Sequence, residues 1–301
     1  MKVGIIGLGG IAQKAYLPVI TARGNTDLVF CTRNEATLNK LSQKYRISEF
    51  TNSIDDLIKL GVDAAFVHTA TESHKEVVEK LLKNGIHVYV DKPISYYYDD
   101  ALSLAELSKK VNKTLMVGFN RRFAPMYRNL KEEKKPDIVI IQKNRINQPD
   151  NVRRFVFDDF IHVVDTLRFF MGSSHNEISV RALKKANKLY NVVLQLSNEA
   201  TIAIGIMNRD TGVAEEVVDY MCSGKKFFIE DLVHTTKYEN NKEEIFKFND
   251  WDPTLYRRGF YQIIDEFLNS VEENRTPSIT IEDSLITHEI CEKAVETLMN
   301  K

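Results

Sequence analysis

The pattern of hydrophobic and polar residues changes near residue 120. Before that point, short apolar runs alternate with amphipathic stretches, which is typical of a parallel sheet with helices on both faces. Strands are expected at 2–7, 28–31, 48–51, 64–67, 87–90 and 114–119. Helices are expected at 10–23, 34–45, 72–84 and 99–111, with another opened by the Ser53 cap. Pro18 should kink or restart the first helix, because proline has no backbone N–H.

After residue 120, helices are expected at 125–134 and roughly 158–171, around a strand at 137–147. Five strand-like runs with hairpin-type connections follow, at 177–186, 189–197, 200–208, 214–222 and 225–231, and two helices close the chain, at 256–272 and 282–300. We therefore predict an α/β protein with two domains. Residues 1–120 form a Rossmann-type, doubly wound parallel sheet. Residues 121–301 form an α+β domain with a largely antiparallel open sheet, whose last helices can pack back on the first domain.

Composition narrows the class of protein. The chain has 301 residues, a net charge of −1 and 43% hydrophobic residues, values that are ordinary for a soluble globular protein. Without a long run of one charge sign, nucleic acid and anionic membranes are not expected partners. No apolar stretch approaches the ~18 residues of a membrane span, and the N-terminus enters a strand directly, so we expect a cytoplasmic protein. Its cysteines, Cys31, Cys222 and Cys291, are far apart and read as reduced core thiols, and no metal site is predicted.

Glycines follow the first apolar run directly. Gly7, Gly9 and Ala12 match the G-x-G-x-x-A form of the dinucleotide fingerprint. The first glycine turns the chain, the second lets backbone approach a pyrophosphate, and the alanine lets the helix lie close to the strand. Glycine pairs also mark ordinary turns, but here they lie at the first strand-to-helix turn of a β-α-β pattern. We therefore predict that NAD(P) contacts the segment Gly7, Leu8, Gly9, Gly10, Ile11 and Ala12.

The end of the second expected strand bears on the choice between NAD and NADP. An acidic residue there binds the ribose 2′-hydroxyl of NAD, whereas an arginine accommodates the 2′-phosphate of NADP. This chain has Thr32 and Arg33 at that place, and its first carboxylate is Glu35. We predict NADP in preference to NAD, with a solvated loop arginine as the alternative.

The segment 85–93, Gly-Ile-His-Val-Tyr-Val-Asp-Lys-Pro, resembles the E-K-P segment of the Gfo/Idh/MocA oxidoreductases. The resemblance covers nearly the whole chain and includes Ser73-His74, 118–125 and 158–165. Among subgroups, the chain most resembles the MviM-like bacterial proteins. The resemblance implies an NAD(P)-dependent dehydrogenase or reductase whose ligand is a sugar, a polyol or a related carbonyl compound. The chain departs from the family at Asp91, where glutamate is usual.

Lys92 follows the fifth expected strand of the first domain. Ligands of such sheets bind beyond the carboxyl ends of the strands, so Lys92, Asp91, Thr69 and Ala70 are expected beside the cofactor. Pro93 can fix the turn, for instance through a cis bond. The alternative for Lys92 is a side chain that points to water. For His74, the resemblance implies a place on the nicotinamide side, and a histidine that satisfies backbone groups at a helix start is an equal alternative.

The expected helix 158–171 carries the candidate chemistry of the second domain. Asp158 and His162 are four residues apart and share one helical face, and Asp165 lies close to it. The resemblance assigns Asp158 and His162 to the family's D-x-x-x-H pair and Asp165 to its downstream aspartate. A surface helix with ordinary charge pairs is the alternative, and Asp159 competes with Asp158. The glycines usual in the family near this aspartate are replaced by phenylalanine and valine, Phe155, Val156, Phe157 and Phe160.

Alcohol oxidation by a nicotinamide needs a base for the hydroxyl proton, and histidine, with an ordinary pKa near ~6.5, suits that role. We take His162 as general acid/base, Lys92 as the group that holds the reacting oxygen, and Asp158 as an orienting residue. Two other functions stay open: a sensor that binds NAD(P) without turnover, and redox-neutral sugar chemistry with tightly held NAD. An uncovered face of the C-terminal sheet predicts a homodimer or higher homo-oligomer.

Overall fold

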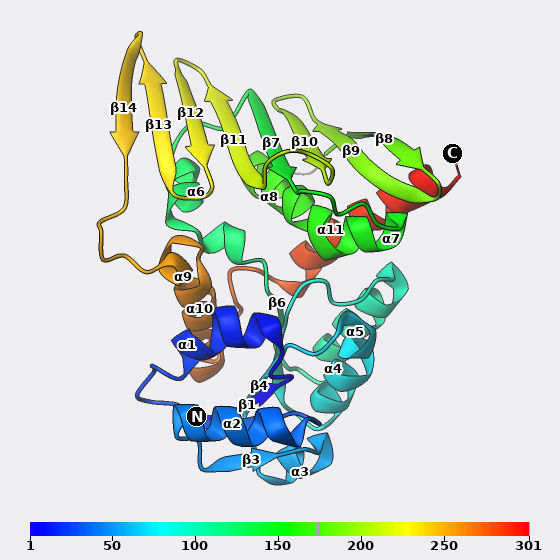
Figure 1. Cartoon of the computed structure of the whole chain (residues 1–301), viewed down its shortest axis with the longest axis vertical. Coiled ribbons are helices and arrows are strands. Elements are labelled where there is room, and N and C mark those ends of the chain that lie inside the picture. Colours follow the sequence, from blue (N-terminus) through cyan, green and yellow to red (C-terminus); the bar gives the residue numbers. More distant parts are fainter. Residues whose placement is uncertain (173–174, 301) are drawn as a thin grey trace. The chain divides into compact units, whose positions relative to one another are not determined.

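A computed structural model describes residues 1–172 and 175–300 of the chain (Figure 1). The chain divides into two compact units. Unit 1 comprises Met1–Gly118 and Phe260–Ile286, and unit 2 comprises Phe119–Gly259 and Thr287–Lys301. The C-terminal helices are therefore divided between the units, because α10 (Phe260–Glu272) belongs to unit 1 and α11 (Ile281–Met299) begins in unit 1 and continues in unit 2.

Unit 1 contains the predicted Rossmann-type sheet. Its six strands are all parallel and lie in the order β3-β2-β1-β4-β5-β6. The strands are β1 (Lys2–Ile6), β2 (Asp27–Cys31), β3 (Glu49–Thr51), β4 (Ala64–Val67), β5 (His87–Val90) and β6 (Leu115–Val117). The helices between them are α1 (Leu17–Ile20), α2 (Glu35–Tyr45), α3 (Ile54–Lys59), α4 (His74–Lys83) and α5 (Tyr98–Lys110). The predicted α/β class is confirmed.

Local capping explains where two of these helices begin. The side chain of Asn34 accepts from the backbone N–H of Thr37 at 2.9 Å, and the Ser53 hydroxyl accepts from that of Asp56 at 3.4 Å. The helix predicted at 10–23 is instead a π-helical turn, Ala12–Tyr16, followed by the short α1. Pro18 lies in the first turn of α1, where its missing N–H costs no helical hydrogen bond.

Helix α10 closes the core of unit 1 from a distant part of the sequence. The ring of Phe267 packs edge-on against Phe66 of β4, with centroids 5.1 Å apart, and Phe260 packs in the same way on Tyr16 at 5.3 Å. Arg23, after α1, forms an ion pair with Asp265 of α10. Sequence pattern predicts α10 as a helix, and these contacts assign it to the first unit.

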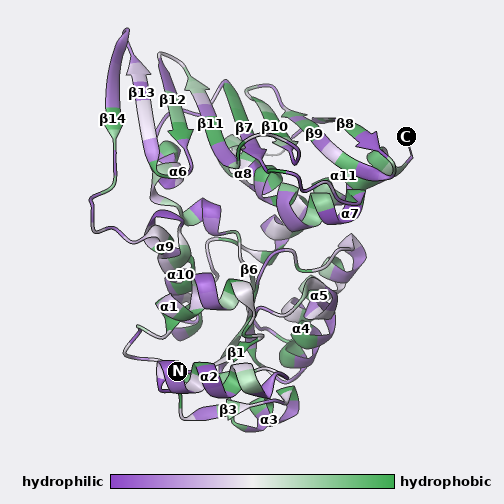
Figure 2. Cartoon of the chain, in the orientation of Figure 1, coloured by the Kyte–Doolittle hydropathy of each residue, from purple (hydrophilic) through white to green (hydrophobic). Residues whose placement is uncertain are grey.

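Unit 2 contains an eight-stranded sheet in the order β14-β13-β12-β11-β7-β10-β9-β8. Its strands are β7 (Ile138–Asn144), β8 (Glu177–Lys185), β9 (Lys188–Ser197), β10 (Ile202–Asn208), β11 (Glu215–Cys222), β12 (Lys225–Glu230), β13 (His234–Glu239) and β14 (Lys242–Phe246). Within this sheet, β7–β10 is the only parallel pair among the described residues, so the predicted largely antiparallel sheet is confirmed. Sequence pattern does not predict β13 and β14, which carry more polar residues than β7 and β10 (Figure 2).

Helix α8 (Ile161–Met171) lies along one face of this sheet (Figure 1). A Cβ added at Gly205 of β10 would lie 2.7 Å from Cγ1 of Val163 and 2.9 Å from Cδ1 of Leu167, so the missing side chain permits close packing of the helix. The helix predicted at 158–171 is interrupted: α7 (Val152–Arg154) leads into a π-helical segment, Phe155–Phe160, before α8 begins. The prediction of one regular helix over 158–171 is therefore wrong, because Asp158 lies in the π-helical segment and His162 lies in α8.

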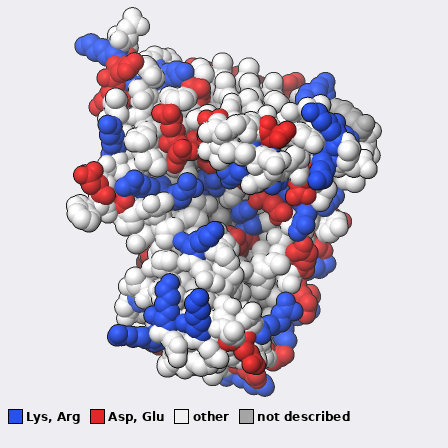
Figure 3. Space-filling model, viewed as in Figure 1, with Lys and Arg blue, Asp and Glu red and all other residues white. Residues whose placement is uncertain are grey.

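Two further α-helices of unit 2 are short. They are α6 (Pro125–Asn129) and α9 (Thr254–Arg257), so the helix predicted at 125–134 stops earlier, and the one predicted at 256–272 is α9 and α10 separated by Gly259. No helix in the described ranges is long and apolar enough to cross a membrane. Basic and acidic side chains are interspersed on the face shown in Figure 3.

Candidate active site

Unit 1 has a cavity of about 390 Å³ at the carboxyl ends of its central strands. Predicted cofactor residues from three strand ends line it: Gly7, Leu8, Gly9, Thr32, Arg33, Thr69 and Ala70. In sheets of this type, that edge is where dinucleotides bind. The cavity therefore joins the glycine turn after β1 to the segments that follow β2 and β4.

Gly7 shows why the turn needs glycine. Its φ is +86°, a left-handed conformation that side chains rarely adopt. An added Cβ would lie 2.7 Å from the carbonyl carbon of His68 and 2.7 Å from the backbone nitrogen of Thr69. By contrast, positions Gly9 and Gly10 face open space, with no heavy atom of the described residues within 4 Å of an added Cβ. The turn thus fits a pyrophosphate, because the phosphates must approach the backbone closely and the space beside Gly9 and Gly10 is open.

Other predicted cofactor residues lie around the cavity and do not line it. Gly10 and Ile11 are exposed, while Ala12 is fully buried, as close helix–strand packing requires. His74 is also buried, and its ring nitrogens lie 2.8 Å from the carbonyl oxygen of Pro93 (Nδ1) and 3.0 Å from that of Thr69 (Nε2). These contacts tie the segment after β4 to the segment after β5, so His74 positions both loops.

Asp91 takes part in a buried cluster. The Tyr16 hydroxyl donates to its Oδ1 at 3.0 Å and lies 2.9 Å from the hydroxyl of Tyr89. Burial raises the pKa of Asp91, and the neighbouring charges of Lys92 and His74 partly offset that effect. A Cβ on Gly118 would lie 2.7 Å from the Tyr89 hydroxyl and 3.0 Å from that of Tyr16, so the cluster requires glycine there. Asp91, which is one methylene shorter than the glutamate usual in the family, is thus held by the Tyr16 hydroxyl directly before Lys92.

Lys92 is half-buried and follows directly after β5. The Lys92–Pro93 peptide bond is cis, as the sequence analysis allowed. Its carboxyl-end position on the sheet is the one from which a lysine can reach a ligand bound above the central strands.

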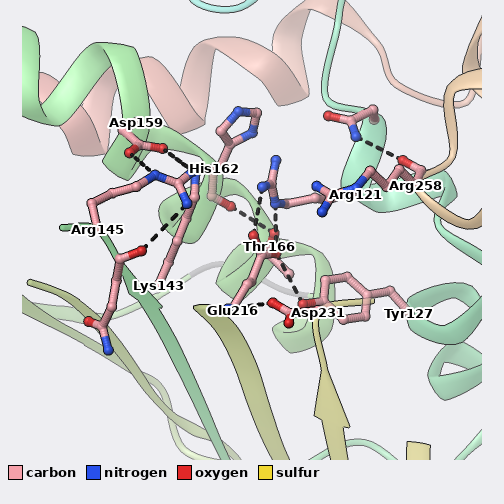
Figure 4. Close-up of polar contacts among 12 residues, drawn as sticks. Arg121, Tyr127, Lys143, Arg145, Asp159, His162, Thr166, Glu216, Asp231 and Arg258 are labelled. Atoms are coloured by element: carbon pink, nitrogen blue, oxygen red, sulfur yellow. Dashed lines mark hydrogen bonds and ion pairs between the residues drawn. The ribbon is translucent and has the colours of Figure 1, made fainter. Parts of the chain in front are cut away.

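In unit 2, the residues of the expected D-x-x-x-H pair differ in their surroundings. Asp158 is partly exposed, and one of its oxygens lies 3.8 Å from Nε of Arg154. His162, on the first turn of α8, is half-buried, and its imidazole points away from the strands (Figure 4). Its carbonyl oxygen accepts from the hydroxyl of Thr166 at 2.7 Å.

Asp159 is directed to the sheet. Its carboxylate forms an ion pair with Lys143 of β7 and accepts from Nε of Arg145 at 3.1 Å (Figure 4). Lys143 is almost fully buried; burial and the nearby Arg121 guanidinium lower its pKa to about 7, although Asp159 opposes this shift. Two cations therefore hold the Asp159 carboxylate against the sheet, whereas the Asp158 carboxylate is more exposed to solvent.

A second buried ion pair lies beside Lys143. Arg121 binds Glu216 of β11 through two hydrogen bonds of 2.7 and 2.6 Å, and the Tyr127 hydroxyl donates to the same carboxylate at 3.2 Å. Burial alone would raise the pKa of Glu216, but the Arg121 guanidinium outweighs it and holds the pKa at about 2. The side chains of both partners are only 9% exposed, so the pair is a buried charge pair whose partners depend on each other.

Asp165 is a structural residue in unit 2. Its carboxylate accepts from Arg122 at 2.9 and 2.6 Å and from the Thr287 hydroxyl at 3.0 Å. It therefore connects α8 with the 3₁₀ turn Asn120–Phe123 and with α11.

Several residues that line the cavity or are buried beside charged groups were not predicted from the sequence. His68, Asn52, Ser73 and Glu76 line the cavity of unit 1. His68 directly precedes Thr69 at the end of β4, so the strand-end argument used for Thr69 could have found it. Lys143 gave no signal, because a lysine on a strand is usually exposed. Among the residues described, no group of three histidine, cysteine or acidic side chains could hold a metal ion.

Fold and cavity together define a class of protein: one with a Rossmann-type, dinucleotide-binding unit and a second α+β unit. A family model described as "Oxidoreductase family, NAD-binding Rossmann fold" matches residues 1–119. A second model, described as "YceM-like, C-terminal domain", matches residues 125–241.

Individual relatives match over nearly the whole chain. The protein YceM of Salmonella typhimurium is 32% identical over 299 residues, which cover 97% of this chain and 96% of YceM. The structure of the dehydrogenase MviM from Clostridium difficile has a TM-score of 0.95 and 33% identity, and covers 99% of each chain. Myo-inositol 2-dehydrogenase of Thermotoga maritima is 24% identical over 94% of this chain and 92% of its own.

The chain belongs to the Gfo/Idh/MocA family of oxidoreductases, which confirms the resemblance drawn from its motifs. It is an NAD(P)-dependent dehydrogenase or reductase that acts on CH–OH or C=O groups.

The buried Arg121–Glu216 pair gives a stability prediction for unit 2. Glu216→Leu leaves the guanidinium buried without its carboxylate, so the free energy of unfolding should fall by about 3–5 kcal/mol. The double variant Arg121→Leu/Glu216→Leu removes both charges and should recover part of that loss. Urea unfolding followed by circular dichroism measures both. Equal or greater loss in the double variant would contradict the account of a mutually dependent pair.

Proposed function

We propose that this chain transfers a hydride between a nicotinamide dinucleotide and an alcohol or carbonyl carbon of a sugar or polyol. The observation that carries the proposal is the cavity at the ends of β1, β2 and β4, which combines the left-handed Gly7 turn with the cationic Arg33. The bound dinucleotide supplies the hydride acceptor or donor. Gly7, Leu8 and Gly9 would hold its pyrophosphate, and Thr69 and Ala70 would hold the part that lies beyond it.

Lys92 and His162 carry the proposed proton chemistry. Lys92 would hold the reacting oxygen and stabilise negative charge on it, and His162 would take the hydroxyl proton during oxidation and return it during reduction. Asp158 would orient the substrate or His162. Asp159 is a weaker candidate for that role, because Lys143 and Arg145 already bind its carboxylate.

A polyhydroxylated ligand is the proposed substrate class. The myo-inositol 2-dehydrogenase named above supports it, since that relative matches over both units. Lysine, histidine and carboxylate groups also supply the donors and acceptors that several hydroxyls need.

The catalytic assignment predicts a clear difference between turnover and cofactor binding. Lys92→Met and His162→Ala should each lower kcat on the best substrate of a polyol and sugar panel by about 10²–10⁴-fold. Affinity for the dinucleotide should stay within a few-fold of wild type, because the cavity residues are unchanged. Steady-state kinetics and a binding titration measure the two effects. Unchanged kcat in either variant would remove that residue from the mechanism, and cofactor that never exchanges would favour redox-neutral chemistry.

Arg33 predicts a preference for NADP. Its exposed guanidinium lines the cavity beside Thr32, as a 2′-phosphate would require. Arg33→Ala should weaken NADPH binding roughly 10- to 100-fold and leave NADH binding nearly unchanged, as measured by fluorescence titration. Lys40→Ala, which removes an exposed charge from α2, is the matched control. Tighter binding of NADH than of NADPH by the wild type would contradict the preference.

The sheet of unit 2 supports a homodimer. On the face opposite α8, an apolar stripe runs across neighbouring strands, where Ile202 of β10 pairs with Ile138 of β7, and Ile206 pairs with Val193 of β9. These side chains include three that are 37–42% exposed, an unusual amount for large aliphatic residues in one stripe. A second copy of the same face would cover the stripe in an isologous interface.

The dimer proposal is tested by mass in solution. Wild type should scatter light as a particle of twice 34.6 kDa, or a higher multiple, at micromolar concentration. Ile204→Lys places a charge in the middle of the stripe and should dissociate the oligomer, because a buried unpaired ammonium is costly. Phe50→Lys, at an exposed apolar residue of β3, should leave the mass unchanged. A monomeric wild type would overturn the proposal.

A further inference from the structure

His68 is a buried imidazole in the wall of the unit 1 cavity, and the roles argued above leave it unused. It follows β4, is 4% exposed and lines the cavity. Neither ring nitrogen has a hydrogen-bond partner within residues 1–172 and 175–300. Since buried polar groups are almost always hydrogen-bonded, two unpaired nitrogens on one ring at a ligand cavity point to a partner that binds there.

Packing holds this ring in place. The imidazole stacks on the ring of Tyr16, with centroids 4.0 Å apart and planes 32° from parallel, and the ring of Phe66 lies 6.0 Å away. The Tyr16 hydroxyl is in turn fixed by Tyr89 and Asp91. His68 is therefore oriented by its neighbours, while both buried ring nitrogens lack a hydrogen-bond partner within the described residues.

The ring is neutral at ordinary pH. Burial, followed by the charge of neighbouring His74, lowers the pKa of His68 to about 3. A neutral imidazole offers one N–H donor and one acceptor nitrogen. It thus suits a ligand group that can donate as well as accept, such as a ribose hydroxyl or a carboxamide, and it is a poor partner for a phosphate.

Sheet order indicates which half of a dinucleotide reaches His68. Strand β1, which carries the glycine turn, lies between β2 and β4. The adenosine ribose of a dinucleotide binds at the end of β2, where Arg33 lies. The pyrophosphate then lies at the glycine turn after β1. The nicotinamide half follows it and lies at the end of β4. We propose that His68 hydrogen-bonds through a ring nitrogen to the nicotinamide-ribose half of the bound dinucleotide. This inference rests on the proposed function and adds a positioning residue to it.

Binding titrations test the inference without reference to turnover. His68→Leu should weaken binding of the preferred reduced dinucleotide by about 5- to 10-fold, the size expected for one hydrogen bond, and leave ADP binding unchanged. His68→Gln, which keeps a donor and an acceptor, should recover part of the loss. Equal weakening for ADP-ribose would identify the ribose hydroxyl, and weakening for the full dinucleotide alone would identify the carboxamide. His87→Leu, at a half-buried histidine that does not line this cavity, is the control.

The binding titrations distinguish a failure of the proposed function from a failure of the role of His68. If wild type binds no dinucleotide, the proposed function fails; if wild type binds and His68→Leu binds equally well, only the role of His68 fails. If His68→Leu does not fold, ¹⁵N NMR of the wild-type imidazole decides. The ring nitrogen resonances of His68, identified by their loss in the Gln variant, should move on addition of the dinucleotide and stay in place with ADP. Unmoved resonances would overturn the inference.

Discussion

Unit 1 depends on the close approach of the turn after β1 to the backbone that follows β4. At Gly7, the space for a side chain is taken by the backbone of His68 and Thr69, 2.7 Å from where a Cβ would lie. This contact fixes the floor of the cavity, because β1 lies between β2 and β4 in the sheet. The contact therefore fixes the distance across the cavity between Arg33, after β2, and the segment His68–Thr69, after β4. A side chain at Gly7 would change all of these positions together.

Unit 2 depends instead on paired charges. Asp159, Glu216 and Asp165 each bind a cation from another element, respectively Lys143, Arg121 and Arg122. Such pairs add little net stability compared with apolar packing, but each fixes the direction of two side chains. They anchor the π-helical segment and α8 to the sheet and to the 3₁₀ turn Asn120–Phe123. The orientation of His162 follows from the placement of that helix.

Sequence pattern predicted the parallel sheet, the glycine turn and the strand-end lysine, because each depends on local spacing. It missed β13 and β14, whose residues are mostly polar and lie at the edge of the sheet, where alternation gives no signal. It also treated 158–171 as one regular helix, since a π-helical turn has no pattern of its own. Lys143 could not be found from the sequence, because its surroundings come from segments far apart in the chain, whereas His68 lies at a strand end that the sequence did predict. The distinction between Asp158 and Asp159 required the positions of Lys143 and Arg145.

The path of the chain has a consequence for protein engineering. The polypeptide leaves unit 1 after Gly118, returns at Phe260, and leaves again within α11 after Ile286. Neither unit is a contiguous piece of sequence, so a simple truncation near residue 120 would remove α10, whose Phe267 packs on Phe66 of the parallel sheet. A chimera that exchanges cofactor-binding modules between relatives must therefore transplant two segments, 1–118 and 260–286, and the second of these ends within α11, a helix that continues in unit 2.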